Sequence, residues 1–228
     1  MEIKKQLSRK QLLKEPDEFL SFTAKLFKYI LDNKTKIALA FGMLAIIVMA
    51  FSGIKYYALQ AENKAFFLLE KAASQYEKIK NNKKNTNISV VEDKFKFIIG
   101  KYSGNNAGKM AGVMLANIYF QKGKYSEAIE LYKKNLSHFK NNGYCRNIII
   151  SGIGYCYEGT KDLKKAVKYF EMIAAGDNPF MKDEAYFNLG RLYFAIGDNN
   201  KSKKSYEQIV SQYAGSIYYE IAKEKALG

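Results

Sequence analysis

The segment from Ile37 to Ile54 constrains this chain most, because its eighteen consecutive residues carry no charged side chain. Lys36 and Lys55 close the segment on either side. At about 1.5 Å rise per residue, a helix of this length spans roughly 27 Å, close to the ~30 Å hydrocarbon core of a bilayer. Backbone polar groups must be satisfied internally in that medium, so the segment is predicted to be a transmembrane helix. The alternative, a buried helix of a soluble protein, rarely lacks charge on every face over such a length.

The residues that flank this segment indicate an orientation. Tyr56 and Tyr57 follow it directly, where amphipathic rings favour the headgroup level. Four lysines lie within fifteen residues before the segment and two lie within fifteen residues after it. Because cytoplasmic flanks collect basic residues, residues 1–36 are predicted to form a cytoplasmic tail, residues 37–54 the anchor, and residues 55–228 a domain on the far side of the membrane.

A cleaved signal peptide is the alternative to an anchor, since Ala50 and Ser52 have the small-residue spacing of a cleavage site. The preceding 36 residues contain fourteen charged side chains, which is far more than the basic region of a signal peptide holds. The sequence therefore favours an uncleaved signal anchor.

An amphipathic helix is predicted over residues 17–31 of the tail. Lys25, Lys28 and Asp32 share one side of it, and Pro16 presets the dihedral of its first turn. The side chains that recur on the other side are Phe19, Thr23, Leu26, Phe27, Ile30 and Leu31. Such a helix is suited to a membrane surface, and docking on a partner protein is an equal alternative.

Net charge and cysteine spacing bear on two questions, whether the chain binds nucleic acid and whether it contains a disulfide. The chain carries a formal net charge of +15, but its lysines are scattered and often adjoin acidic residues, so we expect a solvated surface and no nucleic-acid partner. Cys145 and Cys156 are eleven residues apart, which on one helix separates their Cα atoms by roughly 16 Å, and a disulfide requires less than about 7 Å. We therefore expect two free thiols.

The chain after the anchor repeats itself. A Leu/Ile-small-x-x-Tyr pattern recurs at steps of 38 and 36 residues, and a second small-x-x-x-aromatic pattern follows each copy at the same interval. The first pattern comprises Leu115-Ala116-x-x-Tyr119, Ile153-Gly154-x-x-Tyr157 and Leu189-Gly190-x-x-Tyr193, and the second Ala128/Tyr132, Ala166/Phe170 and Ser202/Tyr206. Small residues in the two helices of a pair permit close approach, and a single pair cannot bury its apolar face, so neighbouring pairs must stack.

These residues resemble the tetratricopeptide repeat over about residues 109–215. The match departs from the family pattern at Asn135, where a small residue is usual, and at Ser202, which replaces Ala. A further pair is predicted ahead of these repeats, with a first helix over 56–80, a polar loop over 81–87 and a second helix around Val91 to Tyr102; residues 216–227 supply a closing helix. The predicted fold class is all-α, a single transmembrane helix followed by a tetratricopeptide-like helical-repeat solenoid.

The layout of a short tail, one anchor and an exported repeat domain resembles the bacterial single-pass inner-membrane proteins that are ancillary subunits of the Sec translocon. That resemblance implies a periplasmic scaffold whose partners are the translocon, exported chains or periplasmic chaperones.

Residues for catalysis are nearly absent. His138 is the single histidine, so no metal site or acid–base pair is assembled around it, and Gly152 and Gly154 belong to a helix rather than to a phosphate loop. We therefore expect no enzymatic activity and no cofactor.

Function is expected to reside in a surface, because first helices line the concave side of such stacks. Phe120, Tyr155, Phe187 and Phe194 are the aromatic anchors expected there, unless the closing helix covers them. The full candidate groove comprises Met110, Val113, Asn117, Phe120, Ser151, Tyr155, Glu158, Phe187, Arg191 and Phe194.

Three functional hypotheses follow. The first is a membrane-tethered interaction scaffold for protein export or envelope assembly. The second is a structural subunit of a larger membrane machine, such as a secretion or pilus base. The third is a basic domain that binds anionic lipid, polysaccharide or nucleic acid.

Overall fold

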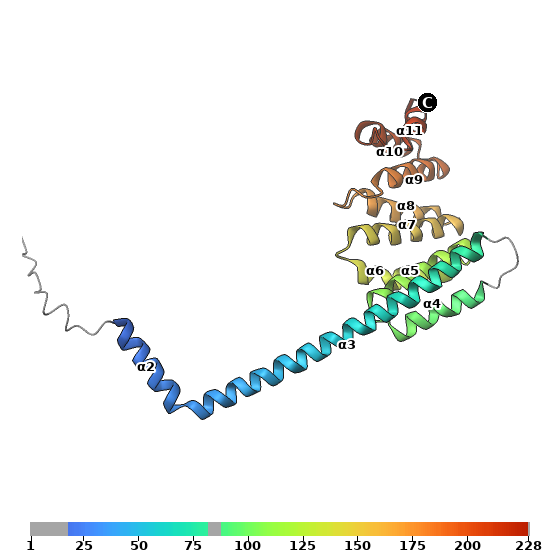
Figure 1. Cartoon of the computed structure of the whole chain (residues 1–228). Helices are drawn as coiled ribbons and strands as arrows, with labels where there is room; N and C mark the ends of the chain where they lie inside the picture. Colours follow the sequence, from blue (N-terminus) through green and yellow to red (C-terminus); the bar gives the residue numbers. More distant parts are fainter. Residues whose placement is uncertain (1–17, 82–87, 228) are drawn as a thin grey trace, which may run out of the picture. The chain divides into compact units, whose positions relative to one another are not determined.

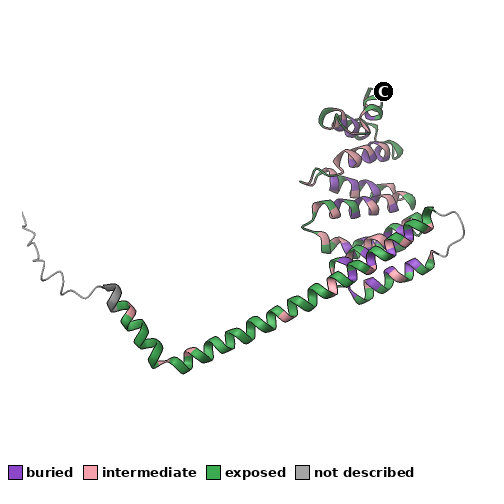
Figure 2. Ribbon diagram, in the orientation of Figure 1, coloured by how far each residue is buried: buried purple, intermediate pink, exposed green. Residues whose placement is uncertain are grey.

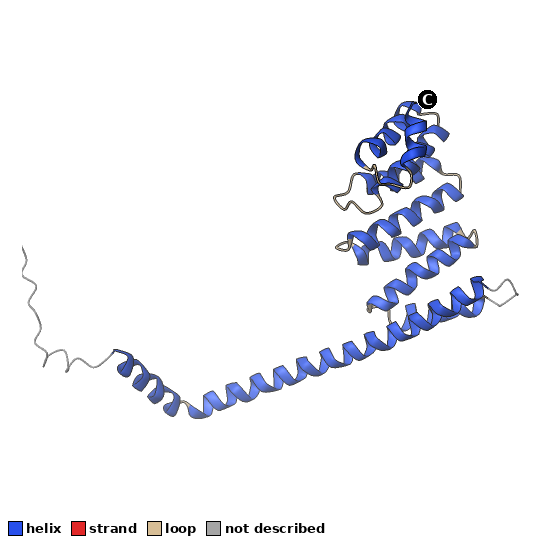
Figure 3. Ribbon diagram, turned by 45° about the horizontal axis from the view of Figure 1, so that its top comes forward, coloured by secondary structure: helices blue, strands red, loops and turns tan. Residues whose placement is uncertain are grey.

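A computed structural model describes residues 18–81 and 88–227, and within these ranges it consists of helices without strands (Figure 3). The elements are α2 (Glu18–Asp32), α3 (Lys34–Asn81), α4 (Ser89–Lys101), α5 (Asn106–Gln121), α6 (Tyr125–Leu136), the 3₁₀ turn η1 (Ser137–Phe139), α7 (Gly143–Gly159), α8 (Leu163–Ala174), α9 (Lys182–Ala195), α10 (Asn199–Gln212) and α11 (Tyr219–Leu227) (Figure 1). The predicted all-α class is confirmed. The first seventeen residues of the predicted tail and loop residues 82–87 lie outside the described residues.

The chain divides into two compact units, one up to Leu59 and one from Gln60. The first unit holds α2 and the beginning of α3. Among the described residues, α3 is the one helix long and apolar enough to cross a membrane, judged by length and composition. All of its large apolar side chains from Leu39 to Ile54 are solvent-exposed (Figure 2). None of the described residues covers this surface.

The second unit is a stack of helical pairs. The end of α3 pairs with α4, and α5/α6, α7/α8 and α9/α10 follow, with α11 packed on α10; from α4 onward each helix packs on the next along the chain (Figure 1). The sequence predicted one face of α3 to be apolar, and Ala65, Leu69, Ala72 and Tyr76 on that face are buried. The Glu62 carboxylate accepts hydrogen bonds from the backbone N–H groups of Asn106 and Ala107, both at 3.2 Å, and so caps the start of α5.

The three turns within the later pairs share one geometry. Gly123, Lys161 and Gly197 all have a left-handed backbone, with φ of 72°, 62° and 84°. The residue after each of them donates its N–H to the carbonyl of the repeat tyrosine, as Asp162 does to Tyr157 at 2.9 Å. Glycine suits this conformation, since a side chain clashes there, and Lys161 is the exception.

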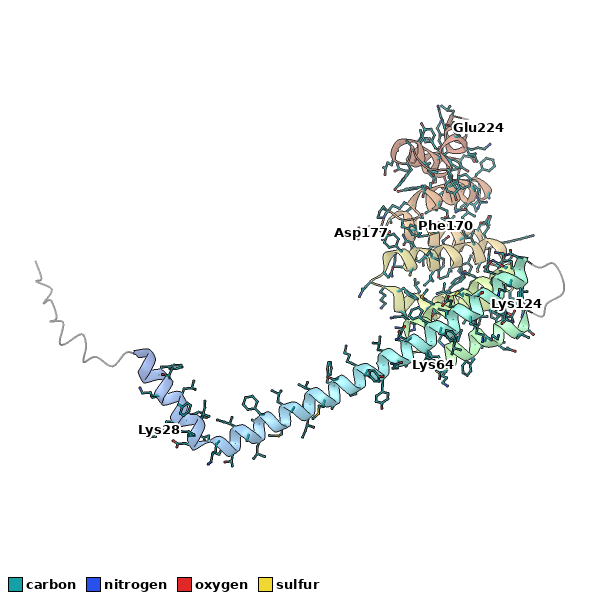
Figure 4. All side chains as sticks on the ribbon, in the orientation of Figure 1. Lys28, Lys64, Lys124, Phe170, Asp177 and Glu224 are labelled. Atoms are coloured by element: carbon teal, nitrogen blue, oxygen red, sulfur yellow. The ribbon has the colours of Figure 1, made fainter. Side chains whose placement is uncertain are left out.

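Glycines in the first helices receive aromatic rings from the second helices. A Cβ atom at Gly154 would lie 2.8 Å from the Phe170 ring, and one at Gly190 would lie 2.6 Å from the Tyr206 ring. Figure 4 labels Phe170 within the stack. Both rings are buried, so the small residues of the repeat pattern create the close approach that the sequence predicted.

Asn135 departs from the repeat pattern, and the structure explains how it fits. This buried side chain lies against Gly112, where an added Cβ would come within 2.4 Å of the Asn135 amide nitrogen. Its amide donates a hydrogen bond of 2.7 Å to the carbonyl of Leu131, which satisfies the buried polar group. A glycine in the facing helix therefore accommodates the larger residue.

Both cysteines lie on α7 and are free thiols, as expected from their spacing.

Candidate functional site

The candidate site is the outward side of the first helices α5, α7 and α9, which we call the first-helix face. Equivalent positions on these helices recur at the repeat steps of 38 and 36 residues. The ten groove residues predicted from the sequence belong to these three helices: Met110, Val113, Asn117 and Phe120 to α5; Ser151, Tyr155 and Glu158 to α7; Phe187, Arg191 and Phe194 to α9. Their surroundings divide the face into a polar part, an aromatic part and an exposed apolar part.

The polar part joins α7 to α9 by side-chain hydrogen bonds. The Tyr155 hydroxyl donates to Glu184 Oε1 at 2.8 Å, and Asn188 Nδ2 donates to the same hydroxyl at 2.9 Å. Ser151 is buried, and its Oγ donates to Glu184 Oε1 at 3.3 Å. Burial, together with the hydrogen bond to Glu184, raises the pKa of Tyr155 well above its ordinary value. Tyr155 therefore stays a neutral donor in this network.

Arg191 completes the polar part. Its Nη1 and Nη2 atoms donate to the two carboxylate oxygens of Glu158 at 3.0 Å and 3.1 Å, and Nη2 also donates to Asn188 Oδ1 at 2.7 Å. Burial is the largest single influence on the pKa of the guanidinium and lowers it, but the hydrogen bond and charge of Glu158, together with Tyr155 and Tyr206, raise the pKa overall. Because its donors and acceptors engage one another, this network fixes α7 against α9 and leaves few polar groups for a ligand.

Three of the four predicted aromatic anchors are partly covered. Phe120 lies against Tyr125 and Tyr155, with ring centroids 5.8 Å and 6.4 Å apart. Phe187 stacks on Tyr218, with centroids 4.5 Å apart and planes 18° apart. Tyr218 precedes the closing helix, so the end of the chain covers part of the face.

Phe194 is the anchor that remains open, with 69% of its surface exposed. It lines a hollow of about 690 Å³ together with Arg191, Tyr206 and Glu224, between α9, α10 and α11. On α5, Val113 is half-buried, while Asn117 is exposed and accepts a hydrogen bond from the Tyr132 hydroxyl.

The exposed apolar part lies at the N-terminal ends of α5 and α7 and just before α9. Met110, Tyr144, Ile148 and Phe180 are 41%, 61%, 41% and 38% exposed, and we call these four residues the apolar patch. The Tyr144 and Phe180 rings lie 5.2 Å apart, and Asn147 Nδ2 ties Phe180 down through its carbonyl at 2.8 Å. Tyr144 and Phe180 are therefore held in place by contacts with α7 and with each other, as interface anchors require.

Sequence reasoning missed Tyr144, Phe180 and Asn188 as members of this face. A signal for two of them was present: Tyr144 lies one helical turn before Ile148, and Phe180 follows Tyr144 at the repeat step of 36 residues. Asn188 lies one turn after Glu184, but nothing in a lone asparagine marks it as the centre of a network.

The potentially reactive groups are isolated. Cys156 is buried, which raises the pKa of its thiol to about 12 and keeps it protonated. His138 lies in the exposed turn η1. In the part of the chain that the structure describes, no three His, Cys, Asp or Glu side chains are grouped to hold a metal ion.

A stack of antiparallel helical pairs with small-residue contacts within each pair defines an α-solenoid, a class of protein that presents extended surfaces to protein partners. More narrowly, residues 33–216 match the tetratricopeptide repeat-like domain family, and the chain belongs to that family. Its repeats indicate a protein–protein interaction scaffold.

Among curated proteins, the human intraflagellar transport protein 88 homolog is 30% identical over 118 residues, which is 51% of this chain and 14% of that protein. The chain thus matches a small part of that relative's length.

Among solved structures, a tetratricopeptide repeat protein from Parabacteroides merdae aligns with a TM-score of 0.58 and 19% identity, covering 73% of this chain and 59% of that one. BtubC (BKLC) from P. vanneervenii aligns with a TM-score of 0.50 and 15% identity, covering 70% of this chain and 74% of that one. At these identities the likeness is one of fold.

Proposed function

We propose that this protein is a membrane-anchored interaction scaffold that holds partner proteins on its first-helix face at the periplasmic side of a bacterial inner membrane. Anchoring is supported by the apolar segment Ile37–Ile54, whose large side chains are exposed in the part of the chain that the structure describes. A tether confines the repeat unit to the membrane surface, and the raised effective concentration lets weak contacts suffice.

The apolar patch carries the proposal that the face binds protein. Met110, Tyr144, Ile148 and Phe180 are exposed, although comparable side chains in the repeat core are buried. The neighbouring network of Tyr155, Glu184, Asn188 and Arg191 is internally satisfied, so the patch offers shape and apolar area rather than charge. An apolar segment of a protein partner fits that chemistry.

A role in protein export or envelope assembly follows from the layout of tail, anchor and repeats. This layout resembles the ancillary subunits of the Sec translocon, so translocon subunits, exported chains and periplasmic chaperones are the first partners to test. Protease treatment of intact spheroplasts tests the placement: the repeat unit should be digested together with an exported control protein. Survival of the repeat unit while that control is degraded would refute the periplasmic assignment.

The binding surface is tested by a photo-crosslinking residue at Tyr144 in otherwise intact membranes. We expect discrete adducts that disappear when Ile148→Asp is added to the same chain. The matched control is Ile217→Asp, which removes an isoleucine that is 86% exposed but lies outside the patch. Loss of adducts in both variants, or in neither, contradicts a binding role for the patch.

A structural subunit of a larger membrane machine is the second candidate. The exposed apolar patch favours it equally, since permanent interfaces are apolar. Size-exclusion chromatography in mild detergent separates the two: a fixed stoichiometric assembly supports the machine subunit, and a monomer or loose dimer supports the scaffold.

A further inference from the structure

Helix α2 has a wide apolar side that is left uncovered by residues 18–81 and 88–227, the part of the chain that the structure describes. Phe22 and Phe27 are 65% and 66% exposed, and Leu26, Tyr29, Ile30 and Leu31 are exposed as well. Lys25, Lys28 and Asp32 recur at steps of three and four residues, so at 3.6 residues per turn they fall within roughly 60° of the helix circumference. The apolar side chains fill an arc of about 200° opposite them.

The connection between α2 and α3 indicates what covers the apolar side of α2. Asn33 is the single residue between the two helices, and both its backbone N–H and its side-chain amide donate to the Tyr29 carbonyl, at 3.1 Å and 3.0 Å. The backbone N–H of Ile37 donates in turn to the Asn33 carbonyl at 2.9 Å. Asn33 thus joins the two helices, since it donates to the last turn of α2 and accepts from Ile37, the first residue of the apolar segment.

This link keeps α2 at the membrane surface wherever the apolar segment spans the bilayer. Five residue steps separate Asp32 from Ile37, and even a fully extended chain covers at most about 18 Å in five steps. A lipid surface is therefore within reach at all times, whereas a protein partner would have to be recruited. The charged side chains also favour a lipid surface, because Lys25 and Lys28 on the polar side of α2 can meet anionic headgroups (Figure 4 labels Lys28). Tyr29 lies between the polar and apolar sides, at the headgroup level that aromatic rings favour.

We propose that α2 is an interfacial helix that lies in the plane of the membrane, with its apolar arc in the headgroup–acyl boundary and Lys25 and Lys28 directed to anionic headgroups. The inference rests on the proposed anchoring of Ile37–Ile54. It adds a second lipid contact, which fixes the depth of the anchor.

The test uses the full chain with Cys145→Ser and Cys156→Ala, so that single cysteines can carry an environment-sensitive fluorophore. The purified protein is reconstituted into vesicles of phosphatidylcholine and phosphatidylglycerol that contain a lipid with a quencher near the headgroup. Phe27→Cys and Lys28→Cys form a matched pair, because they are neighbours in the chain and differ in the side of α2 they occupy. Leu26→Cys and Lys25→Cys form a second pair, and Ile46→Cys reports on the anchor.

For an interfacial helix, quenching at positions 27 and 26 should exceed that at positions 28 and 25 by at least about twofold, since an in-plane helix places its two sides at different depths. The label at position 46 should be quenched more strongly by a lipid with its quencher near the end of the acyl chain.

The alternative outcomes are distinct. Equal quenching within both pairs, with the label at position 46 still quenched, overturns the interfacial helix and leaves the anchor intact. No quenching at position 46 overturns the anchor and the inference with it. Energy transfer between labels on α2 that rises with the protein-to-lipid ratio, without lipid quenching, identifies a second copy as the cover. Protection of position 27 from a soluble thiol reagent in native membranes, without quenching in pure vesicles, identifies a partner protein.

Discussion

Lys161 occupies the left-handed position that Gly123 and Gly197 occupy in the other two turns, and this difference predicts a stabilising substitution. A left-handed backbone costs a residue with a side chain about 1–2 kcal/mol. Replacement by glycine removes this cost, but it also lowers stability by about 0.4–1 kcal/mol, because glycine raises the conformational entropy of the unfolded chain. Lys161→Gly should therefore raise the free energy of unfolding by about 0.5–1 kcal/mol.

For a chain of this size, each kcal/mol moves the thermal midpoint by about 2–4 °C, so we expect a rise of about 1–4 °C. The measurement is thermal unfolding followed by far-ultraviolet circular dichroism on the full chain in detergent. Gly197→Lys is the matched control, and it should lower the midpoint by a similar amount. A Lys161→Gly protein that melts below the parent would refute the argument from backbone strain.

Three further substitutions or conditions test other contacts. Asp198 caps α10 by accepting from the Lys201 N–H at 3.0 Å, so Asp198→Ala should cost about 1 kcal/mol of stability while Asp198→Asn stays near the parent; equal losses would argue against the cap. The Glu158–Arg191 pair is partly exposed, with side chains 29% and 38% accessible, so a double-mutant cycle of Glu158→Gln and Arg191→Met should give a coupling energy of about 0.5–1 kcal/mol, and additive effects would contradict it. Burial raises the pKa of Tyr132, Tyr155 and Tyr193 above the ordinary value of 10.0, so the stability these groups contribute is present below pH 10 and is lost as the pH rises further. An alkaline titration should show these tyrosines ionising together with loss of helical signal, and complete ionisation with helicity retained would be the contrary result.

The repeat architecture was predictable because its signal is periodic. Small residues at 116, 154 and 190 and aromatics at 132, 170 and 206 recur in register, and packing of paired helices requires that combination. The buried side of α3 was predictable for the same reason, since Ala65, Leu69 and Ala72 follow helical spacing.

The same pattern could not predict which side chains of the first-helix face are covered and which are exposed. Positions on a face follow from spacing, but coverage depends on contacts between distant parts of the chain, such as Tyr218 stacking on Phe187. The satisfied network around Asn188 has the same origin, because it joins side chains 33 residues apart on different helices. Lys161 also gave no sign of its left-handed backbone, since lysine is not a turn marker.

The glycine-to-ring contacts within the α7/α8 and α9/α10 pairs have a consequence for how this protein varies. A ring at 170 or 206 is seated on the backbone of the opposite helix, and a methyl group there would collide with it. A larger residue at position 154 or 190 fits only if the facing residue at 170 or 206 is smaller. In related chains, positions 154 and 170 should therefore change together, and so should positions 190 and 206. The same kind of contact also joins neighbouring pairs, where Gly152 lies against the Tyr132 ring, so a chimaera should fold only when both members of each such contact come from the same parent.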